Sequence, residues 1–342
     1  SDVCSSDLLA VTVYQSGRKG SATTSDFSAT ALSETLKAAL EIAAHGEADE
    51  FAGLAAPQYL AESVPDLDLD HPWDLGAPEA IALALKCEQA ATGSDARIKQ
   101  SDGASVNRYR GTRAYANSHG FHGAYCGTRH SISAIMIAED ASGAMQRGYW
   151  YESARDAGAL EDVESIGRRA CARTLAKLGA AKIETCELPV LFEPRVASGF
   201  IGHLVSAISG SAQYRKASFL LDALGDTVMP ASLSLSECPH LPGAIGSAPF
   251  DRDGVATRDK TIVDNGRLKS YLLSAYAARR LGREPTGNAG GTHNLILDGG
   301  TRDLAAMIGA QDRALLVTDL MGFGVNGVTG DYSRGEIGRA HV

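Results

Sequence analysis

The sequence predicts an α+β protein in which an N-terminal antiparallel sheet carries helices on one face and a β-rich C-terminal domain with helices follows. Three observations support this prediction. Segments with helical spacing of apolar residues flank residues 98–155, where the spacing changes to period two and glycine turns recur. The length of 342 residues suits about two domains of about 150 residues each. We therefore expect an α+β domain over residues 9–184 and a β-rich domain over residues 185–335.

The first domain should open with two short strands within residues 8–24, joined by a turn at Gly17. Ser28 is typical of a helix N-cap, and the helix that it begins should end at Gly46. Proline in a first turn starts a second helix over residues 77–92. The first helix should pack through the apolar residues that recur at helical spacing, which are Leu32, Leu36, Ala39, Leu40 and Ala43.

Residues 98–155 should form an antiparallel meander of four or five strands. A third helix over residues 163–178 should close the first domain against this sheet. The turns of the meander are expected at the dipeptides that end in glycine, which are 102–103, 110–111, 119–120 and 142–143.

The second domain should contain a hairpin around Asn265-Gly266, because Asn-Gly between strand-like runs is a strong hairpin signal. Its strands should cover 260–263 and 268–273. Further strands are expected at 188–192, 232–235, 293–297 and 314–319, and helices at 195–209, 219–224, 275–281 and 302–308.

Both ends of the chain differ from the rest. Residues 1–8 and 336–342 show no hydrophobic period, and each can be back-translated into a strand of a common sequencing adapter. We therefore interpret both as adapter-derived and exclude them from the fold. The C-terminal domain is then incomplete, with the natural protein continuing past Gly335; a natural disordered terminus is the alternative.

The composition excludes several functional classes. Hydrophobic residues make up 44% of the chain and charged residues 21%, which is ordinary globular composition. A net charge of −9 argues against nucleic-acid binding, which needs clustered Lys and Arg. No apolar run reaches the roughly 18 residues of a membrane helix, and no signal peptide opens the chain, so we expect a cytoplasmic protein without membrane association.

No histidine pair with metal-binding spacing lies on a predicted helix, so we assign this chain no metal ligand, no cofactor and no catalytic residue. His119 and His122 are three residues apart, but in a strand–turn–strand segment. His203 lies on an apolar helix with Ala207 one turn later, which is typical of a core or interface histidine.

Two glycine-rich loops are candidates for a binding site. In residues 286–294, consecutive glycines allow the backbone to approach a ligand closely, and their N–H groups lie beside polar side chains. Residues 322–335 form a second loop, in which Asp331, Tyr332 and Arg334 could line a cleft or a subunit contact. A purely structural turn is the alternative for both loops. The predicted substrate-binding residues are Asn288, Gly290, Gly291, His293 and Asn294.

These loops and the segments around them resemble the TldD/PmbA family, and specifically its PmbA (TldE) branch. The resemblance covers residues 9–335. The segment Val328-Thr329-Gly330-Asp331-Tyr332-Ser333-Arg334-Gly335 is close to diagnostic for the family. The other matching segments are 116–121, 128–131, 214–222, 250–258, 264–268 and 278–291.

The resemblance implies a role without a metal. TldD subunits of the family carry a His-Glu-x-x-x-His zinc motif, which falls on residues 202–207 here. Gly202 and Ala207 then occupy the two ligand positions, and His203 the glutamate position. The family also usually has Gln where this chain has Phe323, and a further C-terminal region.

The resemblance therefore implies the metal-free subunit of a cytoplasmic heterodimeric metalloprotease. A TldD-like partner would supply zinc, and this chain would shape a closed chamber and hold unfolded peptides. Two alternatives remain open at this stage: a self-sufficient homodimeric metallopeptidase that uses dispersed His, Cys and Asp ligands, and a binding or scaffold protein without enzymatic activity.

Overall fold

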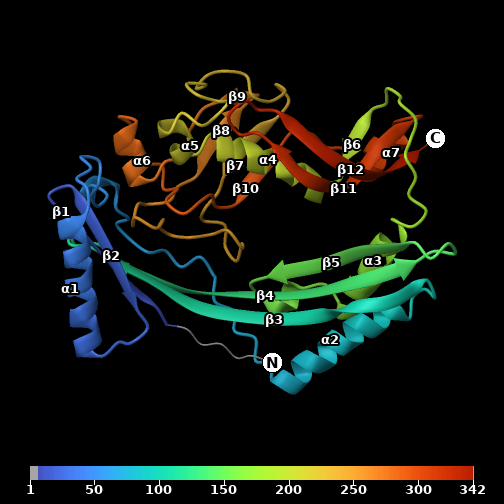
Figure 1. Ribbon diagram of the computed structural model, residues 1–342, viewed down its shortest axis with the longest axis horizontal. Helices are drawn as coiled ribbons and strands as arrows, with labels where there is room; N and C mark the ends of the chain where they lie inside the picture. The colour runs from blue at the N-terminus through green and yellow to red at the C-terminus, as the bar shows by residue number, and fades with distance from the viewer. Residues whose placement is uncertain (1–6, 342) are drawn as a thin grey trace.

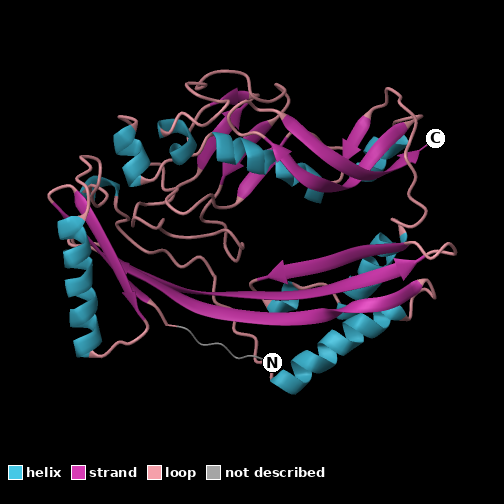
Figure 2. Cartoon of the chain, viewed as in Figure 1, coloured by secondary structure: helices cyan, strands magenta, loops and turns pink. Residues whose placement is uncertain are grey.

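The computed structural model describes residues 7–341 of the chain. Figure 1 shows an antiparallel sheet with helices on one face, and a second, β-rich part of the chain stands opposite the other face. A small hairpin with one helix lies at one end of the molecule. Figure 2 shows that both halves mix helices and strands. The predicted α+β class is thus confirmed. Among the helices in the described part of the chain, none is long and apolar enough to cross a membrane.

The N-terminal hairpin joins β1 (Leu9–Gln15) to β2 (Arg18–Thr24), as predicted. The helix α1 (Ala29–His45) follows, and the hydroxyl of Ser28 accepts a hydrogen bond from the Ala31 N–H at 3.3 Å. This is the expected N-cap.

The packed face of α1 differs from the prediction. Ala39 and Ala43 are fully buried, whereas Leu36 and Leu40 are exposed. A Cβ added to Gly20 on β2 would lie 2.0 Å from the Ala39 carbonyl oxygen, so the helix backbone touches the strand. Only small side chains fit at that approach, and the leucines therefore lie on the outer side.

The meander consists of three long strands, β3 (Ile98–Ala116), β4 (His122–Glu139) and β5 (Met145–Ala154), and not of four or five. Two of the four predicted turns lie inside β3. The dipeptide 102–103 lies at a register irregularity between Ser101 and Gly103, and Gly111 stands directly opposite Gly127 within the ladder. A glycine inside a strand produces the same sequence signal as a glycine in a turn.

One face of this sheet is covered by α2 (Ala77–Thr92) and α3 (Val163–Leu175), at the predicted positions. Fully buried Met136 from β4 and Ile166 from α3 belong to their shared core. Short 3-10 helices lie at Pro57–Tyr59 and Ala157–Ala159.

The C-terminal half contains two further sheets. One has the order β10-β7-β8-β9, and the other has β11 between β12 and the parallel strand β6. The strands of the first are β7 (Ser234–Glu237), β8 (Lys260–Asp264), β9 (Arg267–Leu268) and β10 (Leu295–Asp298). Those of the second are β6 (Val190–Phe192), β11 (Ala314–Val325) and β12 (Tyr332–His341). The helices are α4 (Pro194–Ala207), α5 (Gly210–Tyr214), α6 (Ala275–Arg280) and α7 (Leu304–Gly309).

Four predictions for this half need correction. The second strand of the Asn265-Gly266 hairpin covers only Arg267–Leu268, and not 268–273. Residues 219–224 form turns and no helix, and a short helix lies earlier, at α5, where Ser209 caps its first turn. The strand expected at 188–192 covers only Val190–Phe192, at the edge of its sheet. Most of the predicted loop 322–335 belongs to the two strands of the β11–β12 hairpin.

The adapter interpretation of the two ends stays a prediction. Residues 1–6 and 342 lie outside the described residues, whereas residues 336–341 pair with β11 as part of β12.

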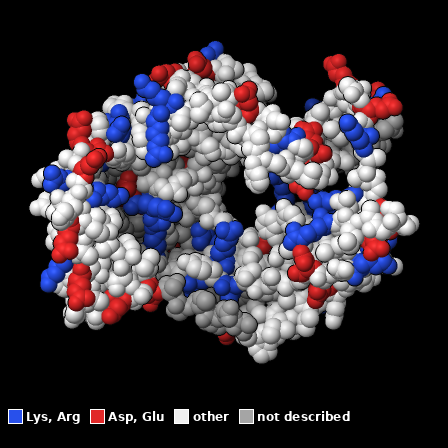
Figure 3. Space-filling view, in the orientation of Figure 1, with Lys and Arg blue, Asp and Glu red and all other residues white. Residues whose placement is uncertain are grey.

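Basic side chains tie the two halves together at both ends. The Arg279 guanidinium on α6 donates to the carbonyls of Phe51, Gly53 and Leu54 at 2.7–2.9 Å. At the other end, Arg173 on α3 makes two hydrogen bonds to the carboxylate of Glu193 at 2.8 and 2.9 Å. Figure 3 shows a hollow between the halves, with Lys and Arg on both sides of it.

Candidate functional site

The glycine loop, residues 286–294, connects α6 to β10 and forms one wall of a cavity. Gly290 and Gly291 have φ values of +102° and +125°, which side chains rarely adopt. A Cβ at Gly290 would lie 2.6 Å from Cδ of Arg252, whereas the space beside Gly291 is open. Glycine is therefore required by conformation at both positions and by packing at the first.

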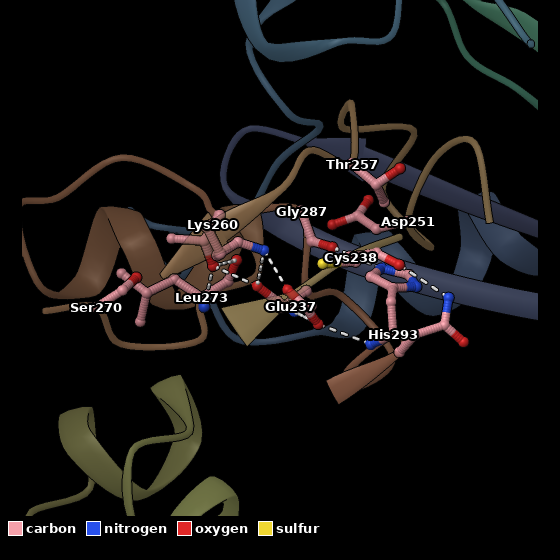
Figure 4. Close-up of polar contacts among 12 residues, drawn as sticks. Glu237, Cys238, Asp251, Thr257, Lys260, Ser270, Leu273, Gly287 and His293 are labelled. Atoms are coloured by element: carbon pink, nitrogen blue, oxygen red, sulfur yellow. Dashed lines mark hydrogen bonds and ion pairs between the residues drawn. The ribbon is translucent and has the colours of Figure 1, made fainter. Parts of the chain in front are cut away.

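A buried ion pair contacts the glycine loop and stabilises it. Glu237 at the end of β7 is fully buried, and it pairs with Lys260, its register partner on β8. The same carboxylate accepts the His293 backbone N–H at 2.7 Å. Figure 4 shows Glu237 between Lys260 and the loop residue His293. The two strands thus place a carboxylate where it orders the loop.

The Asn288 side chain belongs to this network. Its oxygen accepts hydrogen bonds from Lys260 at 3.0 Å and from the Thr286 hydroxyl at 2.7 Å. Its nitrogen donates to Glu237 at 2.9 Å and to the Gly291 carbonyl at 3.2 Å. All of these groups belong to the protein, and Asn288 is buried. The side chain therefore fixes the loop, and only its outer edge lines the cavity.

Asp251 holds the loop from the opposite side. Its buried carboxylate accepts the backbone N–H of Ala289 at 2.8 Å, and those of Asp253 and Val255 at 2.8 and 3.0 Å. Burial raises the pKa of Asp251 to about 7, although the hydrogen bond from Ala289 acts in the opposite direction. This carboxyl group thus titrates near neutral pH while it anchors the loop.

The other two predicted residues contact the segment 238–247. The two ring nitrogens of His293 lie 3.2 Å from the Gly246 carbonyl and 3.1 Å from the Gly287 carbonyl. Asn294 donates to the carbonyl of Cys238 at 2.8 Å and to the hydroxyl of Ser247 at 2.7 Å. Both side chains therefore connect segments of the protein, and neither lines the cavity beside the loop.

That cavity has a volume of about 270 Å³ and lies between the loop and the region where α4 ends and α5 begins. Gly290, Gly291 and Thr292 form one wall, and the serines 209, 211 and 274 supply hydroxyl groups. Within the described residues, the backbone N–H groups of Gly290 and Thr292 have no hydrogen-bond partner. Both residues line the cavity, so these N–H groups are candidate donors to the carbonyl groups of an extended peptide.

Sequence reasoning missed the residues that build this site. Glu237 and Lys260 are 23 residues apart and carry no motif, and the only signal was a charged residue at the end of each of two strands. Serines 209, 211 and 274 lie where helices begin. Serine is common at such positions for capping alone, so nothing in the sequence indicated that these serines line a cavity.

The helix α4 offers no metal site. Gly202 is exposed with open space around it, Ala207 is buried, and neither side chain has a donor atom. The His203 ring packs against Tyr332 with centroids 5.8 Å apart, beside Phe200. Among the described residues, no group of three or more His, Cys, Asp or Glu side chains could hold a metal ion. The two motif positions on α4 therefore supply no atom that could bind zinc.

The second predicted loop makes contacts within its own hairpin and with α4. Asp331 accepts a hydrogen bond from the Thr329 hydroxyl at 2.6 Å, which closes the turn of the hairpin. Arg334 lines a separate cavity with Trp150 and Arg195, and Phe323 is almost fully exposed. The structure thus separates Tyr332 and Arg334 from the first loop.

Two family models match the chain. Residues 70–178 match the PmbA/TldA metallopeptidase central domain, and residues 185–339 match the PmbA/TldA metallopeptidase C-terminal domain. The chain is 44% identical to metalloprotease PmbA of Escherichia coli O157:H7, over 98% of this chain and 74% of that protein. It is 43% identical to a PmbA homologue of Haemophilus influenzae, over 96% and 73%.

Solved structures agree with these matches. A protein from Bacteroides thetaiotaomicron, described as a candidate modulator of DNA gyrase, superposes with a TM-score of 0.91 at 30% identity, over 97% of this chain and 76% of that one. TldE from Thermococcus kodakarensis shares the fold, with a TM-score of 0.75 at 22% identity over 92% and 73%. From the domain matches and the identity along nearly its whole length, the chain belongs to the PmbA/TldD family of metallopeptidases.

Proposed function

We propose that this chain is the metal-free subunit of a two-chain metallopeptidase that cleaves unfolded peptides, and that a TldD-like partner supplies the zinc. The observation that carries the proposal is the chemistry of α4. The resemblance aligns Gly202 and Ala207 with the two histidine ligands of the zinc-binding subunits, and neither residue can bind a metal.

The cavity beside the glycine loop supports a peptide-holding role. Val205 of α4 lines this cavity. In the partner subunits of the family, the same helix carries the zinc motif. The N–H groups of Gly290 and Thr292 could bind the carbonyls of an extended chain, which requires no particular side chain of the peptide. Such binding suits unfolded substrates of varied sequence, and a cytoplasmic location is part of the proposal.

A mixed assay tests the division of labour. Cleavage of an unstructured peptide is measured with this chain alone, with the zinc-binding partner alone, and with both, and the metal content of each purified chain is determined. We expect the highest turnover from the mixture and no stoichiometric zinc in this chain. Stoichiometric zinc together with hydrolysis by this chain alone would instead support a self-sufficient homodimeric enzyme.

A second experiment tests the peptide-holding cavity. Ser211→Trp places a large side chain at an exposed position of the cavity wall, and should weaken peptide binding without loss of stability. Ser33→Trp on α1 is the matched control, because that serine is also exposed and lies outside the cavity. Equal peptide affinity of the two variants would remove the cavity from the proposal.

A further inference from the structure

A second cavity, of about 260 Å³, lies on the face of the β3–β4 ladder that is turned toward the C-terminal half. Tyr125 projects from this face and packs against Phe250 of the C-terminal half, with ring centroids 5.4 Å apart. Helices α2 and α3 cover the opposite face. The cavity therefore lies between the two halves of the molecule.

The register between β3 and β4 determines which side chains line this cavity. Tyr109 stands opposite Arg129, Gly111 opposite Gly127, and Arg113 opposite Tyr125. Positions two apart on a strand share a face, so these three pairs lie side by side. Two glycines form the floor, and a tyrosine and an arginine stand on each side of it. We name these six residues the arginine cradle.

Because they have no side chains, the two glycines let neighbouring groups lie close over the floor. A Cβ at Gly111 would lie 2.3 Å from the Tyr109 hydroxyl, and a Cβ at Gly127 would lie 2.9 Å from Nη1 of Arg155. Side chains at these positions would fill the space between the two cross-strand pairs. Such side chains would displace the Tyr109 hydroxyl and the Arg155 guanidinium, which belong to the lining of the cavity.

The charge of the cradle is not balanced. Within residues 7–341, Arg113 and Arg129 have neither an ion-pair partner nor a side-chain hydrogen bond. Arg155 adds a third positive charge, but its guanidinium is occupied by the carbonyls of Thr128, Ala244 and Ile245. No acidic residue lines the cavity, although the chain has a net charge of −9. Positive charges collected without a counter-ion favour an anionic ligand.

We propose that the arginine cradle binds a carboxylate of the peptide substrate, supplied by an acidic side chain or by the chain terminus, and gives this chain a preference for peptides that present one. The inference rests on the proposed function, because it assumes that peptides enter the space between the two halves. Guanidinium groups bind carboxylates through paired, charge-assisted hydrogen bonds, and the phenol groups of Tyr109 and Tyr125 can donate further ones. The volume suits one acidic side chain or one chain terminus better than a larger ligand.

The test measures the binding of three fluorescent peptides of otherwise identical sequence to the full chain. One has internal glutamates and an amidated end, one has glutamines and an amidated end, and one has glutamines and a free terminal carboxylate. We expect one carboxylate-bearing peptide to bind about tenfold more tightly than the neutral one, a difference of about 1.4 kcal/mol. The peptide that gains affinity identifies the source of the carboxylate.

Arg113→Gln/Arg129→Gln should abolish this preference and leave the affinity for the neutral peptide unchanged. Arg147→Gln is the matched control, because Arg147 is an exposed arginine of the same sheet that pairs with Asp102 outside the cradle. Unchanged circular dichroism and unchanged binding of the neutral peptide show that a variant is folded.

Equal affinity of wild type for all three peptides, or a preference that survives the double substitution, would overturn the carboxylate site and leave peptide holding intact. Wild-type protein that binds none of the peptides would count against the peptide-holding function as well as against the cradle.

Discussion

Replacing Lys260 with methionine tests whether the buried ion pair holds the glycine loop. The Glu237 side chain is fully buried and that of Lys260 is 13% exposed. Without the ammonium group, the carboxylate keeps only two donors, the Asn288 side-chain amide and the His293 backbone N–H. Removal of one partner from a buried pair leaves an uncompensated charge, which costs about 3–5 kcal/mol. We expect Lys260→Met to lower the free energy of unfolding by that amount.

The assay is urea unfolding followed by far-ultraviolet circular dichroism, combined with hydrogen exchange of residues 286–294. Trp73 and Trp150 both lie in the first half, so tryptophan fluorescence would not report on this site. Exchange should accelerate at the His293 N–H, which donates to Glu237, and at the Ala289 N–H in the same loop.

Lys269→Met is the control, since Lys269 lies 3.6 Å from Asp264 and both side chains are about half exposed. An exposed ion pair contributes only about 0–1 kcal/mol, so this variant should unfold almost like the wild type. A loss below about 1 kcal/mol in Lys260→Met, or equal losses in both variants, would refute the assigned role of the network.

Three further predictions concern the surroundings of the site. Burial raises the pKa of Asp251 to about 7, so the free energy of unfolding should fall by up to about 4 kcal/mol as pH rises from about 4 to about 7. Urea unfolding at a series of pH values measures this slope, and Asp251→Asn should remove it. Arg279→Ala leaves the carbonyls of Phe51, Gly53 and Leu54 without their donor, so limited proteolysis should cut near residue 53 faster than in the wild type; an unchanged rate would contradict the clamp. Phe323→Gln should change the free energy of unfolding by no more than about 0.5 kcal/mol, because this side chain is 96% exposed; a larger loss in urea would show an unrecognised contact.

Local signals predicted the elements that depend on neighbouring residues. The N-cap at Ser28 needs only its own hydroxyl and the next turn. The hairpin at Asn265-Gly266 needs two positive φ values, which are 45° and 79° in the structure. Such features are determined by residues within a few positions of each other, so the sequence states them directly.

Local sequence signals could not predict the number of strands in the meander. Gly103 lies at a bulge and Gly111 in the middle of a strand, where it faces Gly127. Only the alignment of β3 with β4 distinguishes these glycines from turn glycines. The same alignment assembles the arginine cradle from residues that no motif connects.

The sequence by itself determined which chemistry α4 lacks, because glycine and alanine have no donor atoms in any fold. It also located the loop whose glycines adopt positive φ values. Tertiary structure alone decided what the side chains of that loop do. Asn288 lies 51 residues from Glu237 and 28 from Lys260, and burial away from water turns these three polar groups toward one another. Gly290 and Thr292, whose backbone N–H groups have no partner among the described residues, line the cavity beside them.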